Sequence, residues 1–225
     1  DFMHDQHSSI FDAGSGLELG YASHDQTIGF DVDPIMARLA VTTGSRWAVW
    51  SEDAWPDGDP LARGQHEAEV IALRPTTNQI ALFASTGIDF FEIPGGTFKG
   101  NLPVIISNPR RVSFDSTGKR MLLLGDSGAS LWTETSAGWK EIHSLSEPVV
   151  DMALNQSGER MIALFGEFSE EGEKNLRDRT VVVGWSVEES GVTELFRKEL
   201  PGYSPGVIAF SNLDDEFVLA LKETS

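Results

Sequence analysis

The chain has 225 residues, 40% of them hydrophobic, which is enough apolar sequence for the core of one or two globular domains. Its formal net charge of −18 would repel phosphate backbones and anionic lipid headgroups, so neither nucleic acid nor a membrane surface is an expected partner. Cysteine is absent, which excludes disulfides, thiolate metal sites and a cysteine nucleophile within these residues.

Residues 1–26 predict two short strands joined by a glycine-containing turn, in the segment SSIFDAGSGLELGYAS. Each of the next four segments of the chain predicts several strands. Alternating apolar residues before a turn mark a first strand at Ile28/Phe30, Ile71/Leu73, Val112/Phe114 and Met152/Leu154. A second strand starts nine residues after Phe30, at Leu39, and seven residues after the last residue of the other three, at Ile80, Met121 and Met161.

A third strand in each segment carries an aromatic residue. Trp50, Phe91 and Trp132 lie 11 residues after the start of the second strand, whereas Trp185 lies 24 residues after Met161, because GEFSEEGEKNLRDR is inserted there. A fourth strand follows each aromatic residue, most clearly in GWKEIHSL and VTELFRKEL. The sequence therefore predicts four-stranded antiparallel units at residues 27–66, 67–109, 110–147 and 148–202. Because the aromatic residues recur at one structural position, we expect them to fill space between sheets.

Residues 203–225 predict only first and second strands, at Ile208/Phe210 and Phe217. Phe11 lies 17 residues before Ile28, close to the 21 residues between Trp50 and Ile71, so residues 1–26 predict the third and fourth strands of a unit. Repeated four-stranded units of 40 to 45 residues favour an all-β fold of the β-propeller type. We expect residues 1–225 to form one such domain. Two architectures stay open: five blades, one of them shared between the termini, or an arc of a larger, seven-bladed propeller.

The pattern resembles the WD40-repeat family over nearly the whole chain. In LLLGDSGASLWTE, the positions of Asp126, Gly128 and Trp132 match the turn acid, the glycine and the strand tryptophan of that family. VWSED, FFEIP and GWSVE are looser copies, while Gly-His and Trp-Asp pairs do not occur. The resemblance implies the shape of a propeller and a role as a sensor or scaffold, and it does not extend to the buried histidine–aspartate network of the family.

The insertion within residues 148–202 is the main candidate for partner binding, because insertions in repeat folds tend to project on a binding face. We also single out Trp55, beside a proline, as a candidate for hydrophobic contact. A tolerated flexible loop is the plainer interpretation of the insertion. Its charged candidate residues are Glu170, Glu171, Glu173, Lys174 and Arg177.

The remaining polar patterns predict no catalytic residue, cofactor or metal site. His66 is expected to cap a turn or loop, and His143 is expected at the surface of an outer strand. No run of residues is long and apolar enough for a membrane helix, and no export signal is visible. Composition alone does not identify the compartment, and we favour the cytoplasm.

These features predict a non-enzymatic scaffold or sensor that contacts another protein or other domains of its own full-length chain. The alternative is a propeller enzyme or a carbohydrate-binding lectin, with its site on the central axis.

Overall fold

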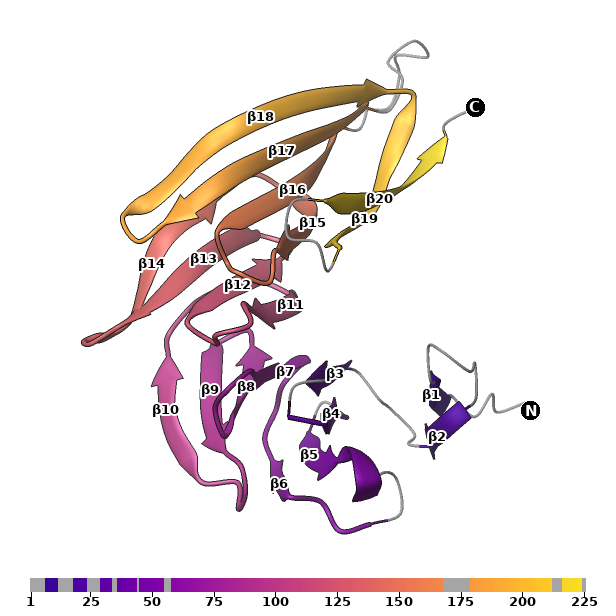
Figure 1. Cartoon of the computed structure of the whole chain (residues 1–225), viewed down its shortest axis with the longest axis vertical. Helices are drawn as coiled ribbons and strands as arrows, with labels where there is room; N and C mark the ends of the chain where they lie inside the picture. The colour runs from indigo at the N-terminus through magenta and orange to yellow at the C-terminus, as the bar shows by residue number, and fades with distance from the viewer. Residues whose placement is uncertain are drawn as a thin grey trace. The chain divides into compact units, whose positions relative to one another are not determined.

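The computed structural model describes residues 7–11, 18–23, 29–33, 36–43, 45–54, 58–167, 179–211 and 216–223. The described residues are β-strands, turns and one short 3-10 helix, η1 (Glu52–Ala54). They divide into two compact units, residues 1–105 and 106–225, and each unit is described by itself (Figure 1).

The first unit contains one two-stranded and two four-stranded antiparallel sheets, with the strand orders β1-β2, β3-β4-β5-β6 and β7-β8-β9-β10. Within each of these sheets, strands that follow one another along the chain pair with each other. The strands are β1 (His7–Phe11), β2 (Glu18–Ser23), β3 (Gly29–Asp33), β4 (Arg38–Thr42), β5 (Arg46–Ser51), β6 (Ala62–Gln65), β7 (Val70–Arg74), β8 (Gln79–Ala84), β9 (Gly87–Glu92) and β10 (Phe98–Leu102).

The second unit contains two four-stranded sheets and one two-stranded sheet, with the orders β11-β12-β13-β14, β15-β16-β17-β18 and β19-β20. The strands are β11 (Pro109–Phe114), β12 (Arg120–Gly125), β13 (Gly128–Thr135), β14 (Gly138–Leu145), β15 (Val149–Leu154), β16 (Arg160–Glu167), β17 (Arg179–Glu188), β18 (Gly191–Pro201), β19 (Tyr203–Phe210) and β20 (Phe217–Glu223). The chain is therefore an all-β protein of four-stranded, blade-like sheets, as the sequence predicts.

The strand register places the four aromatic residues at one structural position. Each lies directly opposite the residue that begins the apolar run of the second strand, in the pairs Leu39–Trp50, Ile80–Phe91, Met121–Trp132 and Met161–Trp185. The predicted equivalence of these aromatic residues is confirmed.

One predicted position in the first four-stranded sheet is wrong by two residues. Leu39 pairs with Val32, not with Phe30. Val32 is therefore the counterpart of Leu73, and the interval of seven residues between first-strand and second-strand positions holds in this sheet too. In the segment IGFDV, apolar residues occupy three alternate positions, Ile28, Phe30 and Val32. The sequence alone could therefore not tell whether Phe30 or Val32 lies opposite Leu39.

The strand pairs contain β-bulges at recurring positions. In β11, β15 and β19 the pairing shifts around the residue four places before the last residue of the strand, namely Arg110, Val150 and Gly206. A second kind of shift lies in fourth strands, opposite the aromatic residue of the third strand. There, two consecutive residues of the third strand pair with fourth-strand residues that are two positions apart. The third-strand residues are Phe90 and Phe91, Leu131 and Trp132, and Gly184 and Trp185. The hairpin β1–β2 has the second kind of shift, between Ile10 and Phe11.

Apolar side chains bury the faces where sheets of the same unit meet. In the first unit, Ile80 and Leu82 are fully buried, and the rings of Trp47 and Phe91 lie 5.3 Å apart. In the second unit, Leu122 and Leu131 belong to the cluster between β11–β14 and β15–β18, and Ile208 belongs to the cluster between β15–β18 and β19–β20. Replacing such a side chain by alanine typically costs about 2–5 kcal/mol.

First strands of neighbouring sheets are also tied by polar side chains. The Leu73 amide donates to Oδ2 of Asp31 over 2.7 Å, and the Ile208 amide donates to Oδ2 of Asp151 over 2.8 Å. Arg111 donates to Oδ1 of Asp151 over 2.9 Å. Side chains thus satisfy strand amides that face the next sheet, and this fixes how neighbouring sheets of a unit meet.

Candidate functional site

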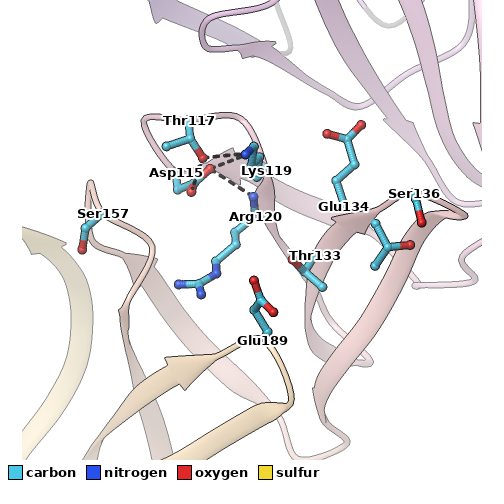
Figure 2. A pocket seen from close by; sticks show the side chains of 10 residues that line it. Asp115, Thr117, Lys119, Arg120, Thr133, Glu134, Ser136, Ser157 and Glu189 are labelled. Carbon is cyan, nitrogen blue, oxygen red and sulfur yellow. Dashed lines mark hydrogen bonds between the residues drawn. The ribbon is translucent and has the colours of Figure 1, made fainter.

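A polar pocket of about 450 Å³ lies in the second unit, among the turns of the sheets β11–β14 and β15–β18 (Figure 2). Its walls come from the turns β11–β12, β13–β14, β15–β16 and β17–β18. The lining residues are Asp115, Thr117, Lys119, Arg120, Thr133, Glu134, Thr135, Ser136, Ser157 and Glu189. All ten side chains are hydroxyl-bearing or charged, which distinguishes this site from the mostly apolar pockets that hold small organic ligands.

Asp115 organises the turn between β11 and β12. Its side chain is buried, with 3% of its surface exposed. Oδ1 accepts hydrogen bonds from the amides of Lys119 (2.8 Å) and Arg120 (3.0 Å), and Oδ2 accepts one from the hydroxyl of Thr117 (2.7 Å). These bonds satisfy the buried carboxylate and hold the turn in one conformation.

The turn between β15 and β16 repeats this arrangement with an amide in place of the carboxylate. Oδ1 of Asn155 accepts from the amide of Arg160 over 2.9 Å, and its Nδ2 donates to the hydroxyl of Ser157 over 3.0 Å. Gly118 and Gly158 occupy the same place in the two turns, with φ of +68° and +76°, a region that favours glycine. The motif Asp/Asn-x-Ser/Thr-Gly-x-Arg therefore builds the same turn twice.

The two turns are bonded to each other, which makes the floor of the pocket rigid. The amide of Ser116 donates to the carbonyl of Gln156 over 2.8 Å. The guanidinium of Arg120 donates to the carbonyl of Gly158. The pocket is therefore built by the packing of two sheets and not by one mobile loop.

Two charged side chains of opposite sign are available at the pocket for a bound molecule. Lys119 and Glu189 are exposed, and neither side chain forms an ion pair or hydrogen bond with the part of the chain that the structure describes. In Figure 2 the carboxylate of Glu189 points into the pocket toward the guanidinium of Arg120, yet the two do not form an ion pair. The cation Lys119 and the anion Glu189 are thus each available to pair with a group of opposite charge on a ligand.

A second polar cluster lies in the first unit. Nε2 of His66 and Oδ2 of Asp89 are 2.7 Å apart, and Nδ2 of Asn101 donates to Oδ1 of the same carboxylate over 2.7 Å. The ring of His66 also contacts that of Phe91, with centroids 5.5 Å apart. The sequence predicts that His66 caps a turn or loop. In the structure His66 follows β6, and the neighbouring sheet holds its side chain.

The prediction for His143 is also revised. It lies on the outer strand β14, as expected, but its ring packs against Trp185 of the adjacent sheet, with centroids 5.9 Å apart. Its Nε2 is buried and has no hydrogen-bond partner among the residues that the structure describes. Burial lowers the pKa of His143, and the nearby Glu141 carboxylate opposes this by raising it.

The candidate partner-binding residues from the sequence lie outside the described residues. These are Trp55, Glu170, Glu171, Glu173, Lys174 and Arg177. The structure instead brings together the polar pocket, which the sequence analysis missed. Its signal was present as the recurrence of DSTGKR and NQSGER in successive units, but these segments read as ordinary turns because nothing in one turn indicates which other turns lie beside it.

The described residues contain no cluster of three or more histidines, aspartates and glutamates able to hold a metal ion. None of the helical structure in the described part of the chain is long and apolar enough to cross a membrane. No protein-family model matches the chain, and no curated protein matches it significantly in sequence.

Proposed function

We propose that this chain is a non-catalytic interaction module, a scaffold or sensor built as a WD-repeat-like β-propeller. It binds a segment of another protein or of another domain of its own full-length chain. The observation that carries the proposal is the polar pocket between β11–β14 and β15–β18, with a rigid floor and charged groups left available.

The chemistry of the lining supports a protein partner. A small organic ligand gains most of its affinity from apolar contact, and the lining offers no aliphatic or aromatic side chain for it. A peptide segment presents amide groups and charged side chains, which pair well with hydroxyls, an ammonium group and carboxylates. The net charge of −18 favours partners with basic surfaces and raises their association rates at low salt.

One observation favours the alternative, an enzyme or lectin. A histidine paired with a carboxylate, as in His66 and Asp89, is a part of many hydrolytic sites. Such a site also needs a nucleophile beside the other ring nitrogen of the histidine, and no hydrogen bond from a hydroxyl to His66 is formed within the described residues. The interaction module therefore remains the better-supported proposal.

The proposal is tested by comparing a pocket variant with a matched surface variant. The pocket variant carries Lys119→Gln and Glu189→Gln, and the control carries Lys140→Gln and Glu188→Gln, which remove the same charges from exposed positions outside the lining. The immobilised full chain and both variants are incubated with native extract, and the bound proteins are quantified by mass spectrometry. We expect at least one protein to bind the wild type and the control and to be lost from the pocket variant. Equal recovery of every bound protein on all three would refute the pocket as the interaction site.

A further inference from the structure

We propose that the pocket recognises an extended peptide segment that carries both a basic and an acidic side chain, and this inference rests on the interaction function proposed above. The basic side chain pairs with Glu189, and the acidic side chain pairs with Lys119. It also pairs with the guanidinium N–H groups of Arg120 that, within the described residues, are not taken up by the bond to Gly158. The hydroxyls of Thr133 and Ser136 serve the main chain of the segment.

The charges of the lining lead to this ligand class. Asp115 is fully engaged by two amides and a hydroxyl, so it adds little to recognition. Among the exposed charges, Lys119 and Glu189 have no partner in the described chain, and they have opposite signs. A ligand with only one sign of charge would satisfy one of them and leave the other unpaired, whereas a segment with both signs satisfies both.

An extended peptide can present such a pair of charges on one of its sides. In an extended segment, side chains two residues apart point to the same side, about 7 Å from one another. A basic and an acidic residue separated by one position can therefore enter the pocket together. The main-chain amide between them presents one donor and one acceptor to the hydroxyls of the wall.

Two competing ligand chemistries fit the pocket less well. A phosphate group would meet Lys119 and Arg120, but it would also face Glu134 and Glu189 within a chain of net charge −18. A sugar ring gains affinity by stacking on an aromatic side chain, and none of the ten lining residues is aromatic.

The test uses defined probes and the full chain labelled with ¹⁵N. The mixed-charge probe is acetyl-Gly-Ser-Lys-Ser-Glu-Ser-amide, and the matched neutral probe has glutamine in place of both charged residues. Two further peptides keep only the lysine or only the glutamate, and inorganic phosphate and glucose are titrated separately. Amide chemical shifts report binding, with the signals of Thr133, Ser136 and Glu189 marking the pocket.

We expect the mixed-charge peptide to shift the pocket signals at concentrations about three- to fivefold lower than either single-charge peptide, as for solvent-exposed ion pairs. Glu189→Gln should remove the advantage of the lysine, and Lys119→Gln the advantage of the glutamate, while Glu188→Gln and Lys140→Gln leave both unchanged. Raising the salt concentration should reduce the differences.

Equal binding of the neutral peptide, or tighter binding of phosphate or glucose at the same signals, would overturn this ligand class. Such a result would leave the interaction function standing if the pocket variant still loses its captured protein. If the capture is unaffected by the pocket variant, the pocket fails as the interaction site whatever the peptides do.

Discussion

At the scale of the residue, His143 shows how a side chain on an outer strand depends on the neighbouring sheet. Its sequence context alternates polar and apolar residues, which predicts a surface position on β14. The ring packs on Trp185, and its Nε2 is buried with no hydrogen-bond partner in the described part of the chain. Protonation would place a charge at this buried nitrogen, which explains why the pKa of His143 is lowered.

We expect His143 to make the protein less stable as the pH falls below about 6.5, the ordinary pKa of histidine in an unfolded chain. Because the folded-state pKa is lower, the unfolded chain takes up a proton first, so stability is lost between pH 6.5 and that lower value. His143→Phe keeps a ring against Trp185 and removes the titration, so it should flatten this part of the pH dependence and add about 1 kcal/mol at neutral pH. Urea unfolding followed by circular dichroism from about pH 5 to 8 measures both effects. An unchanged pH slope in the variant would contradict this account.

At the scale of the element, the turns at Asp115 and Asn155 show that one backbone arrangement accepts either a carboxylate or an amide. In both turns Oδ1 accepts the amide of the arginine that begins the next strand. The second side-chain atom differs: Asp115 accepts from Thr117, and Asn155 donates to Ser157. A hydroxyl can serve either role, because it is both donor and acceptor.

Asp115→Asn should therefore change the free energy of unfolding by less than about 0.5 kcal/mol, because Thr117 can turn its hydroxyl to accept from the new amide. Asp115→Ala should lower it by about 1–3 kcal/mol, because the part-buried amides of Lys119 and Arg120 lose their acceptor. Asn155→Asp is the reciprocal control and should be as mild as Asp115→Asn. Thermal and urea unfolding of the three variants provide the comparison, and a mild Asp115→Ala would show that the turn does not need this side chain.

The strands themselves were predictable because their signals are local. Alternation, turn residues and the recurring aromatic position are read within one unit, and the pairs Ile80–Phe91 and Met121–Trp132 confirm them. The phase of β3 was not predictable, because Phe30 and Val32 satisfy the same alternation and only pairing with Leu39 separates them. The pocket was not predictable for a related reason: it joins four turns, and which turns meet is decided by the packing of two sheets.

At the scale of the whole molecule, the bulges identify which strands of a four-stranded sheet each terminal hairpin corresponds to. The shift in β19 lies at Gly206, four residues before Phe210, as the shifts in β11 and β15 lie four residues before Phe114 and Leu154. The shift in β1–β2 lies beside Phe11, as those in the third and fourth strands of other sheets lie beside their aromatic residues. The hairpin β19–β20 thus has the register of first and second strands, and β1–β2 that of third and fourth strands.

The five-blade hypothesis from the sequence then makes a prediction at residue level. In each four-stranded sheet the second-strand position pairs with the aromatic position, and continuing this register would place Phe217 opposite Phe11 and Ala220 opposite Ser8. The chain has no cysteine, so Ser8→Cys with Ala220→Cys creates one possible disulfide, between positions that would be directly opposite on adjacent strands.

Under mild oxidation at low protein concentration, the five-blade hypothesis predicts an intramolecular disulfide, detected by peptide mapping, and an increase in stability. The expected gain is about 2–4 kcal/mol, because the link would close nearly the whole chain into one loop. Ser8→Cys with Ala209→Cys is the matched control, since Ala209 lies on β19, one strand further from the proposed junction. A disulfide in neither variant, or in both at equal rates, would favour the alternative in which these strands belong to an arc of a larger propeller and pair with strands of other segments.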